Sequence, residues 1–150
     1  MCGIVGFTGH QSAKDVLIEG LKRLEYRGYD SAGIALQNTT NEELTVVHRV
    51  GKVAGLAEAV EYLNNASPCG IGHTRWATHG APSERNAHPH TSCDNQIAVV
   101  HNGIIENFAE LREQLEARGH KFRSDTDTEV VSHLIEEAYR GNLRDAVAKA

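Results

Sequence analysis

The chain opens with Met1-Cys2-Gly3-Ile4-Val5-Gly6-Phe7-Thr8, a cysteine followed by a short, largely apolar run. Its length and composition are typical of a buried β-strand, which we expect over residues 2–8. Ser12, with Asp15 three residues later, then forms a capping-box start for an amphipathic helix that Gly28 would end. A buried strand that leads directly into an amphipathic helix favours an α/β fold.

Strand-like and helix-like segments continue to alternate along the chain. We expect strands over residues 30–36 and 44–50, joined by the polar turn 38–41, and further strands over 69–76 and 97–100. Helical periodicity covers residues 53–63, and further helices begin near residues 107, 126 and 142, the second of them from a capping box of Thr126 and Glu129. No linker, repeat or low-complexity tract separates these segments, so the pattern predicts one unit of mixed α/β (α+β) class.

The composition excludes several classes of function. The 150 residues are 40% hydrophobic and 23% charged, which is normal for a packed soluble domain. A net charge of −5 offers no basic surface for nucleic acid, and no segment is long and apolar enough to suggest a membrane span. The N-terminus lacks the features of a signal peptide, so we expect a cytoplasmic protein. Three cysteines cannot all pair and match no zinc motif, which predicts free thiols.

Cys2 is the first candidate for chemistry. A cysteine at this position can simply be a small buried residue of the strand. Removal of Met1 would instead give Cys2 a free α-amine, whose ordinary pKa of about 7.7–8.0 leaves it partly neutral near neutral pH. Because an N-terminal amine can take the proton of its own side chain, directly or through a water, this arrangement predicts a nucleophilic thiol at Cys2.

His101-Asn102-Gly103 follows directly after the apolar run 97–100. Attack on an amide carbonyl creates an oxyanion, and the Asn102 side-chain amide and the Gly103 backbone N–H could both donate to it. The same dipeptide is also common in tight turns that only reverse the chain. Both interpretations remain open from these residues alone.

Arg75 and Asp127 are candidates for binding a zwitterion. A free amino acid needs a fixed cation for its carboxylate and a fixed anion for its ammonium group. Arg75 lies where the strand 69–76 enters a loop, and Asp127 follows the cap at Thr126. Arg75 could equally be an ordinary surface arginine, and Asp127 could merely complement a helix dipole.

The histidine content raises the question of a metal. His88, His90 and Cys93 are close together in the loop that follows the strand 69–76. Their spacing matches no zinc motif, and His88-Pro89-His90 is better explained as a rigid loop, so we expect no metal. The sequence also lacks a glycine-rich phosphate loop, and we expect no cofactor.

Six blocks of sequence, in order, carry a resemblance to a known family. They are Met1-Cys2-Gly3-Ile4-Val5-Gly6, Leu24-Glu25-Tyr26-Arg27-Gly28-Tyr29-Asp30-Ser31-Ala32-Gly33, His73-Thr74-Arg75-Trp76-Ala77-Thr78-His79-Gly80, Asn86-Ala87-His88-Pro89-His90, His101-Asn102-Gly103-Ile104-Ile105-Glu106-Asn107 and Ser124-Asp125-Thr126-Asp127-Thr128-Glu129-Val130. Together they resemble the N-terminal-nucleophile class II glutamine amidotransferases, and within that family the branch that aminates fructose 6-phosphate.

The resemblance implies an αββα sandwich, of which these residues would form the N-terminal portion, without the remaining strands and without a sugar-phosphate isomerase region. It implies that Cys2 attacks the side-chain amide of L-glutamine to form a thioester. Asn102 and Gly103 would form the oxyanion hole, and Arg75 and Asp127 would hold the carboxylate and ammonium groups of the substrate.

The resemblance also assigns supporting roles. Thr78 and His79 would contact glutamine, Trp76 would gate the passage of ammonia, and Arg27 would support the nucleophile. Fructose 6-phosphate would bind only through the isomerase region of the full-length enzyme, which would be a homo-oligomer. Two alternatives stay open: an enzyme that passes ammonia to phosphoribosyl pyrophosphate, and a glutamine-binding module without turnover.

Overall fold

The computed structural model describes residues 1–38, 44–63, 67–76 and 80–150. Its larger sheet has four antiparallel strands in the order β1-β4-β2-β3. These strands are β1 (Gly3–Thr8), β2 (Ser31–Gln37), β3 (Leu44–Val50) and β4 (Cys69–Arg75). The expected hairpin of β2 and β3 is confirmed, although residues 39–41 of its expected turn lie outside the described residues.

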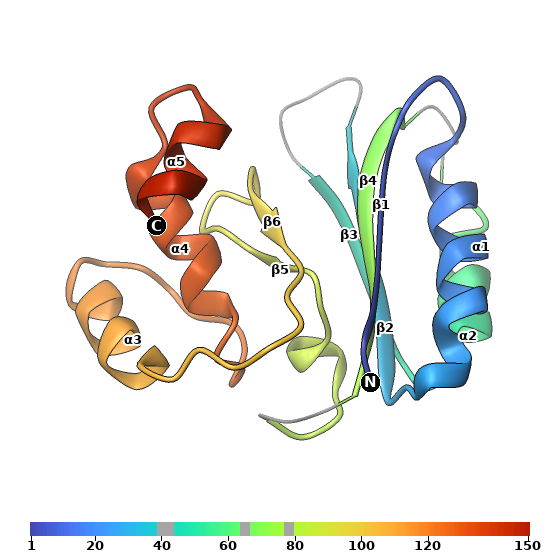
Figure 1. The fold of residues 1–150 in the computed structure, drawn as a ribbon, viewed down its shortest axis with the longest axis horizontal. Helices are drawn as coiled ribbons and strands as arrows, with labels where there is room; N and C mark the ends of the chain where they lie inside the picture. Colours follow the sequence, from blue (N-terminus) through green and yellow to red (C-terminus); the bar gives the residue numbers. More distant parts are fainter. Residues whose placement is uncertain (39–43, 64–66, 77–79) are drawn as a thin grey trace.

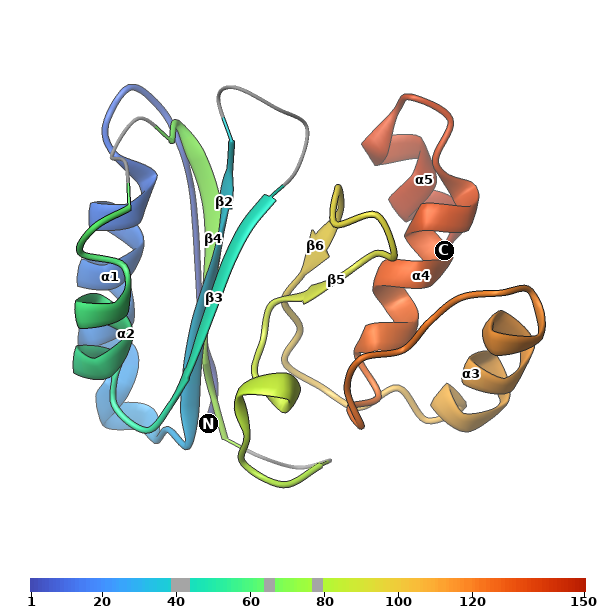
Figure 2. The ribbon, with the colours of Figure 1, turned by 180° about the vertical axis from the view of Figure 1, so that it is seen from behind.

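The elements stack in four layers (Figures 1 and 2). Helices α1 (Ala13–Leu24) and α2 (Val53–Ala59) cover one face of the larger sheet. The short antiparallel ribbon of β5 (His90–Thr91) and β6 (Ala98–Val99) lies on the other side, and three helices lie beyond it. These are α3 (Phe108–Ala117), α4 (Glu129–Ala138) and α5 (Leu143–Lys149). The expected mixed α/β fold with αββα layering is confirmed.

Helix α1 begins as the sequence predicts, but it ends at Leu24, and only the 3-10 turn that follows it reaches the expected stop at Gly28. The Ser12 side chain accepts the backbone N–H of Asp15 at 3.4 Å, and a 3-10 turn, η1 (Glu25–Arg27), leads to Gly28 at a φ of 110°. The main core lies between this helix, α2 and the sheet. Its fully or largely buried members are Ala13, Leu17, Ile18, Leu21, Ala32, Ile34, Leu36, Val53, Leu56 and Val60.

The alternation of side chains along β4 sets the direction of two residues that line a pocket. Gly72 faces α1 so closely that a Cβ there would lie 3.0 Å from Leu21 Cδ1, which explains why a residue without a side chain occupies this position. Because successive side chains of a strand point to opposite faces, His73 and Arg75 project away from α1. Both are buried, with exposed fractions of 1% and 4%. They therefore project toward the side of the sheet where the ribbon of β5 and β6 lies, with α4 beyond it.

Three sequence predictions were wrong in detail. The helix expected over residues 53–63 is only Val53–Ala59. The strand expected over 97–100 is only Ala98–Val99, and the capping box of Thr126 and Glu129 does not form, since α4 begins at Glu129. The Glu129 carboxylate instead accepts the backbone N–H groups of Arg123 and Ser124 at 2.8 and 2.7 Å. The Thr126 hydroxyl pairs with His90 Nε2 at 2.8 Å, so residues 124–128 form an irregular turn held by tertiary contacts.

None of the helices in the described ranges is both long and apolar enough to cross a membrane.

Candidate active site

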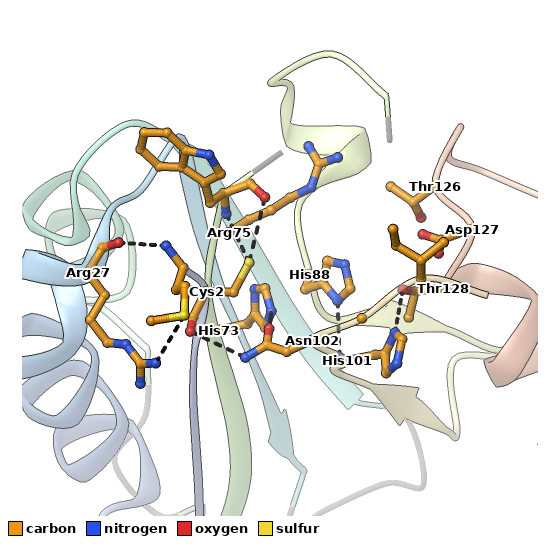
Figure 3. A pocket seen from close by; sticks show the side chains of 14 residues that line it. Cys2, Arg27, His73, Arg75, His88, His101, Asn102, Thr126, Asp127 and Thr128 are labelled. Atoms are coloured by element: carbon orange, nitrogen blue, oxygen red, sulfur yellow. Dashed lines mark hydrogen bonds between the residues drawn. The ribbon is translucent and has the colours of Figure 1, made fainter. Parts of the chain in front are cut away.

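A pocket of about 590 Å³ opens between the end of β4 and the segments that precede α3 and α4. This volume is in the usual range for a small-molecule site. Figure 3 shows its walls, which come from both sides of the layered fold. The lining residues are Met1, Cys2, Arg27, His73, Arg75, Trp76, His88, His101, Asn102, Gly103, Ile104, Thr126, Asp127 and Thr128. Every candidate site residue from the sequence that lies within the described ranges is among them.

Cys2 lies at the start of β1, beside the end of β4. Antiparallel pairing of Gly3 with Thr74 sets this position, and the Thr74 hydroxyl accepts the Gly3 N–H at 3.0 Å. The Trp76 backbone N–H then donates to Cys2 Sγ at 3.1 Å. The thiol is partly buried and faces the pocket (Figure 3). Strand pairing between residues far apart in sequence therefore holds the sulfur in place.

Asn102 lies next to Cys2, and its amide orientation is fixed from both ends. Its Nδ2 donates to the Cys2 carbonyl oxygen at 3.3 Å, and its Oδ1 lies 2.7 Å from His73 Nε2. Because an amide oxygen only accepts, His73 Nε2 carries the proton in this contact. Gly103 follows Asn102 and lines the same pocket. An amide donor thus points toward the Cys2 side of the cavity.

Three buried histidines in mutual contact lie next to Asn102, which bonds the first of them, His73. His73 stacks on His88 with ring centroids 4.3 Å apart, and His88 meets His90 edge-on at 4.5 Å. Burial lowers the pKa of His73 to about 4 and drives the pKa of His88 far below its ordinary value. Burial also lowers the pKa of His90. These imidazoles are therefore neutral near neutral pH, so they can support hydrogen bonds without adding positive charge.

His73 lines the pocket, although the sequence predicts no role for it. Its spacing of two residues from Arg75, on a strand, was the available signal, because residues i and i+2 share one face. His101 was also missed, and its Nδ1 lies 3.3 Å from the Thr128 hydroxyl across the pocket. No local pattern marks that contact, since it joins two loops that are distant in sequence.

Arg75 is held as a fixed cation on the pocket wall. It donates to the Gly80 carbonyl at 3.1 Å, and its Nη1 lies 3.9 Å from Asp30 Oδ1. Only 4% of the residue is exposed, unlike an ordinary surface arginine. A guanidinium held in this way can present its planar donors to a carboxylate.

Asp127 supplies a negative charge on the opposite wall. It precedes α4, with an exposed fraction of 4%, and its Oδ2 accepts the Ile105 backbone N–H at 2.7 Å. Figure 3 shows Asp127 across the pocket from Cys2. It lies before the first turn of α4, in the irregular turn, and it lines the pocket.

The two remaining described candidates lie at the rim. The Met1 ammonium group donates a hydrogen bond to the Arg27 carbonyl oxygen at 2.7 Å, so the backbone of Arg27 holds Met1 in place. Trp76 is 55% exposed, and its indole lies against Gly28, where a Cβ would come within 2.6 Å of the ring. Thr78 and His79, which the resemblance places in contact with glutamine, lie outside the described residues.

The pocket thus joins four chemical features: a thiol, an amide donor beside it, a buried guanidinium and a carboxylate on the opposite wall. A cation and an anion on separate walls suit a zwitterionic amino acid. The thiol and the amide donor suit attack on a carbonyl carbon and stabilisation of the oxyanion that forms.

Comparison with known proteins places this geometry in a family context. The profile of the glutamine amidotransferase domain matches residues 55–146. A glutamine–fructose-6-phosphate aminotransferase (isomerizing) of Thermus thermophilus is 63% identical over 150 residues, which are all of this chain and 24% of that protein. The protein of the same name from Pyrococcus horikoshii is 57% identical over 148 residues, 97% of this chain and 24% of its own length. The chain therefore spans about a quarter of the curated relatives it matches.

Solved structures share the fold. Glutamine phosphoribosylpyrophosphate amidotransferase from B. subtilis, in complex with ADP and GMP, superposes with a TM-score of 0.76 at 30% identity, over 98% of this chain and 31% of that one. A structure described as the allosteric regulatory enzyme of purine biosynthesis gives a TM-score of 0.79 at 30% identity, over 98% and 32% of the two chains.

Proposed function

The chain belongs to the family of glutamine amidotransferase domains, and on that premise we propose that its pocket hydrolyses L-glutamine to glutamate and ammonia through a thioester on Cys2. The observation that carries the proposal is the meeting of Cys2, Asn102, Arg75 and Asp127 around one cavity whose volume is in the range of small-molecule sites. A reducing compartment such as the cytoplasm suits this chemistry, because the nucleophile must remain a free thiol.

In the proposed reaction, Arg75 binds the α-carboxylate of glutamine and Asp127 binds its α-ammonium group. Removal of Met1 gives Cys2 a free α-amine, and this amine accepts the thiol proton through a water. Sulfur attacks the side-chain amide carbon, and the negative charge passes to the carbonyl oxygen. The Asn102 amide and the Gly103 N–H donate to that oxygen.

The tetrahedral intermediate then collapses. The carbon–nitrogen bond breaks, the leaving nitrogen takes the proton held by the α-amine, and ammonia departs from a γ-glutamyl thioester. Water attacks the thioester, the carbon–sulfur bond breaks, and glutamate and the Cys2 thiol are released. His73 keeps Asn102 oriented throughout, because its Nε2–H donates to the amide oxygen. Arg27 supports the nucleophile from the pocket wall, and Trp76 closes the rim.

We further propose that the full-length protein passes ammonia to fructose 6-phosphate. The curated relatives that are 53–63% identical to this chain carry the name glutamine–fructose-6-phosphate aminotransferase (isomerizing). Phosphoribosyl pyrophosphate is the second candidate acceptor, and it is favoured by the likeness to the B. subtilis structure at 30% identity. The higher identity supports fructose 6-phosphate. Incubating the full-length protein with glutamine and each acceptor in turn, and identifying the aminated product by mass spectrometry, decides between them.

A glutamine analogue with an electrophilic group in place of its amide tests the glutaminase chemistry. Peptide mass spectrometry of the treated full-length protein should find one adduct, on Cys2 with Met1 removed, and excess glutamine should prevent it. The Cys69→Ser variant should label as the wild type does, and Cys2→Ser should not label. A folded wild-type protein that forms no adduct on Cys2 would overturn the proposal. Release of glutamate and ammonia from glutamine, measured in the absence of the analogue, would exclude a non-catalytic glutamine-binding module.

A further inference from the structure

A second cluster of reactive side chains lies apart from the pocket. Its members are Cys93, in the turn between β5 and β6, His120, which follows α3, and His133 and Glu136 on α4. One ligand-type atom from each residue lies within 4.8 Å of all the others. None of the four lines the pocket of about 590 Å³. The cluster is therefore separate from the proposed glutaminase chemistry.

The spacing of these atoms matches a tetrahedral metal. Zn–N bonds of about 2.0–2.1 Å and a Zn–S bond of about 2.3 Å place two nitrogen ligands about 3.3 Å apart, and a nitrogen and a sulfur about 3.6 Å apart. His120 Nδ1 and His133 Nδ1 lie 3.3 Å apart, and Cys93 Sγ lies 3.7 and 3.6 Å from them. The sulfur and both nitrogens already occupy the corners that a bound ion requires.

A carboxylate supplies the fourth corner. Glu136 Oε2 lies 3.1 Å from His120 Nδ1 and 3.2 Å from His133 Nδ1. It also accepts the backbone N–H of Cys93 at 3.1 Å, which fixes its direction. One sulfur, two imidazole nitrogens and one carboxylate oxygen form a ligand set that suits zinc.

The outward nitrogens of both histidines lie near carboxylates. His133 Nε2 is 3.7 Å from Glu129 Oε1, and His120 Nε2 is 3.4 Å from Glu137 Oε1. In a metal-binding histidine the second ring N–H usually faces such an acceptor, which leaves the other nitrogen unprotonated for the metal. Both contacts are at ion-pair distance, and His133 Nε2 has no hydrogen-bond partner among the described residues. The His133 side chain is 1% exposed, whereas the side chains of His120 and Glu136 are 12% and 19% exposed, so an ion can enter from solvent.

From this geometry we propose a structural zinc site formed by Cys93 Sγ, His120 Nδ1, His133 Nδ1 and Glu136 Oε2. Four protein ligands complete a tetrahedron and leave no position for a substrate, which is typical of structural rather than catalytic zinc. The ion ties the β5–β6 turn and the segment after α3 to α4. The proposal departs from the expectation of no metal, because ligands separated by 27, 13 and 3 residues form no short motif.

Metal content and thiol protection test the site in the full-length protein. After treatment with a chelator and reconstitution with Zn²⁺, the wild type should contain one more equivalent of zinc than Cys93→Ser or Glu136→Gln. The Cys2→Ser and Cys69→Ser variants should retain that equivalent. Equal zinc content in wild type and Cys93→Ser would overturn the proposal.

A residue-specific readout needs no variant and so does not depend on whether a variant folds. Zn²⁺ should slow the alkylation of Cys93 in the wild type, measured on its tryptic peptide, and the chelator should restore the rate. Alkylation of Cys69 should be unaffected by either treatment. If Cys93 reacts at the same rate with and without Zn²⁺, the four side chains form only a hydrogen-bonded cluster.

Discussion

The Trp76 backbone N–H donates to Cys2 Sγ at 3.1 Å, joining residues that are 74 positions apart in the chain. The contact forms because β1 pairs antiparallel with β4, so the start of one strand meets the end of the other. The indole of Trp76 rests in turn on Gly28, at the end of the turn that follows α1. The position of the sulfur therefore depends on a residue that never touches it.

Gly28→Ala should disturb Cys2 through Trp76. The new Cβ would lie 2.6 Å from the indole, and the φ of 110° adds strain of about 1–3 kcal/mol. Gly51→Ala is the matched control, because its φ is 93° but no heavy atom lies within 4 Å of the added Cβ. We expect labelling of Cys2 by the electrophilic glutamine analogue to slow roughly 10- to 100-fold in Gly28→Ala. Equal labelling rates in the two variants would contradict the coupling.

Asn102→Ala should lower kcat far more than it changes KM. The amide donates to a charge that develops only in the transition state, so its loss should cost roughly 10²–10³ in kcat. Asn107→Ala provides the control, since that exposed asparagine at the start of α3 makes no side-chain capping bond. Steady-state glutaminase kinetics of the full-length variants measure both parameters. A large increase in KM with unchanged kcat would assign Asn102 to ground-state binding.

Asp127→Asn should weaken glutamine binding without disturbing the loop. The asparagine oxygen can still accept the Ile105 N–H, which Asp127 accepts at 2.7 Å, but the charge opposite the substrate ammonium is lost. A charged hydrogen bond contributes about 1.5–3 kcal/mol, so we expect KM to rise roughly 10- to 100-fold. The neighbouring Asp125→Asn removes an exposed charge paired with Arg85 and should leave KM nearly unchanged. Similar KM values for both variants would show that Asp127 does not bind the ammonium group of the substrate.

The sequence predicted the parts of the fold that local chemistry determines. The Ser12 cap, the end of the helical stretch of α1 and η1 at Gly28, and the hairpin of β2 and β3 depend on neighbouring residues, and the structure confirms them. The start of α4 does not depend on local chemistry. Thr126 is a good local cap, but its hydroxyl bonds His90, 36 residues away, and this tertiary contact delays the helix to Glu129.

The candidate site shows the same division. Residues within recognisable blocks, such as Cys2 and Asn102, could be named in advance, and the structure brings them to one pocket while their roles stay predictions. The stack of His73 on His88 could not be predicted, because it joins β4 to a distant loop. The cluster of Cys93 with two histidines and a glutamate could not be predicted for the same reason, because three separate segments of the chain supply its atoms.

His73 should make the stability of β4 depend on pH. Burial lowers its pKa from 6.5 to about 4, and its neighbours include Asn102, which accepts from its ring, Arg75, which opposes a positive charge, and Asp30, which favours one. Above pH 6.5 the ring is neutral in both the folded and unfolded chain, so its full contribution to stability is present. As the pH falls through this window toward 4, the unfolded chain takes up a proton that the folded chain excludes. Stability is therefore lost on the acid side.

Hydrogen–deuterium exchange of β4 peptides in the full-length protein measures this loss as an opening free energy. Between about pH 7.5 and about pH 5, His73 should account for about 2 kcal/mol of the decrease. His73→Gln keeps an N–H donor for Asn102 but cannot be protonated. Over the same pH interval, the opening free energy of this variant should therefore decrease by about 2 kcal/mol less than that of the wild type. Burial lowers the pKa of His88 and His90 as well, and the variant should therefore retain some pH dependence. Identical pH dependence in wild type and His73→Gln would show that His73 does not stay neutral in the folded chain.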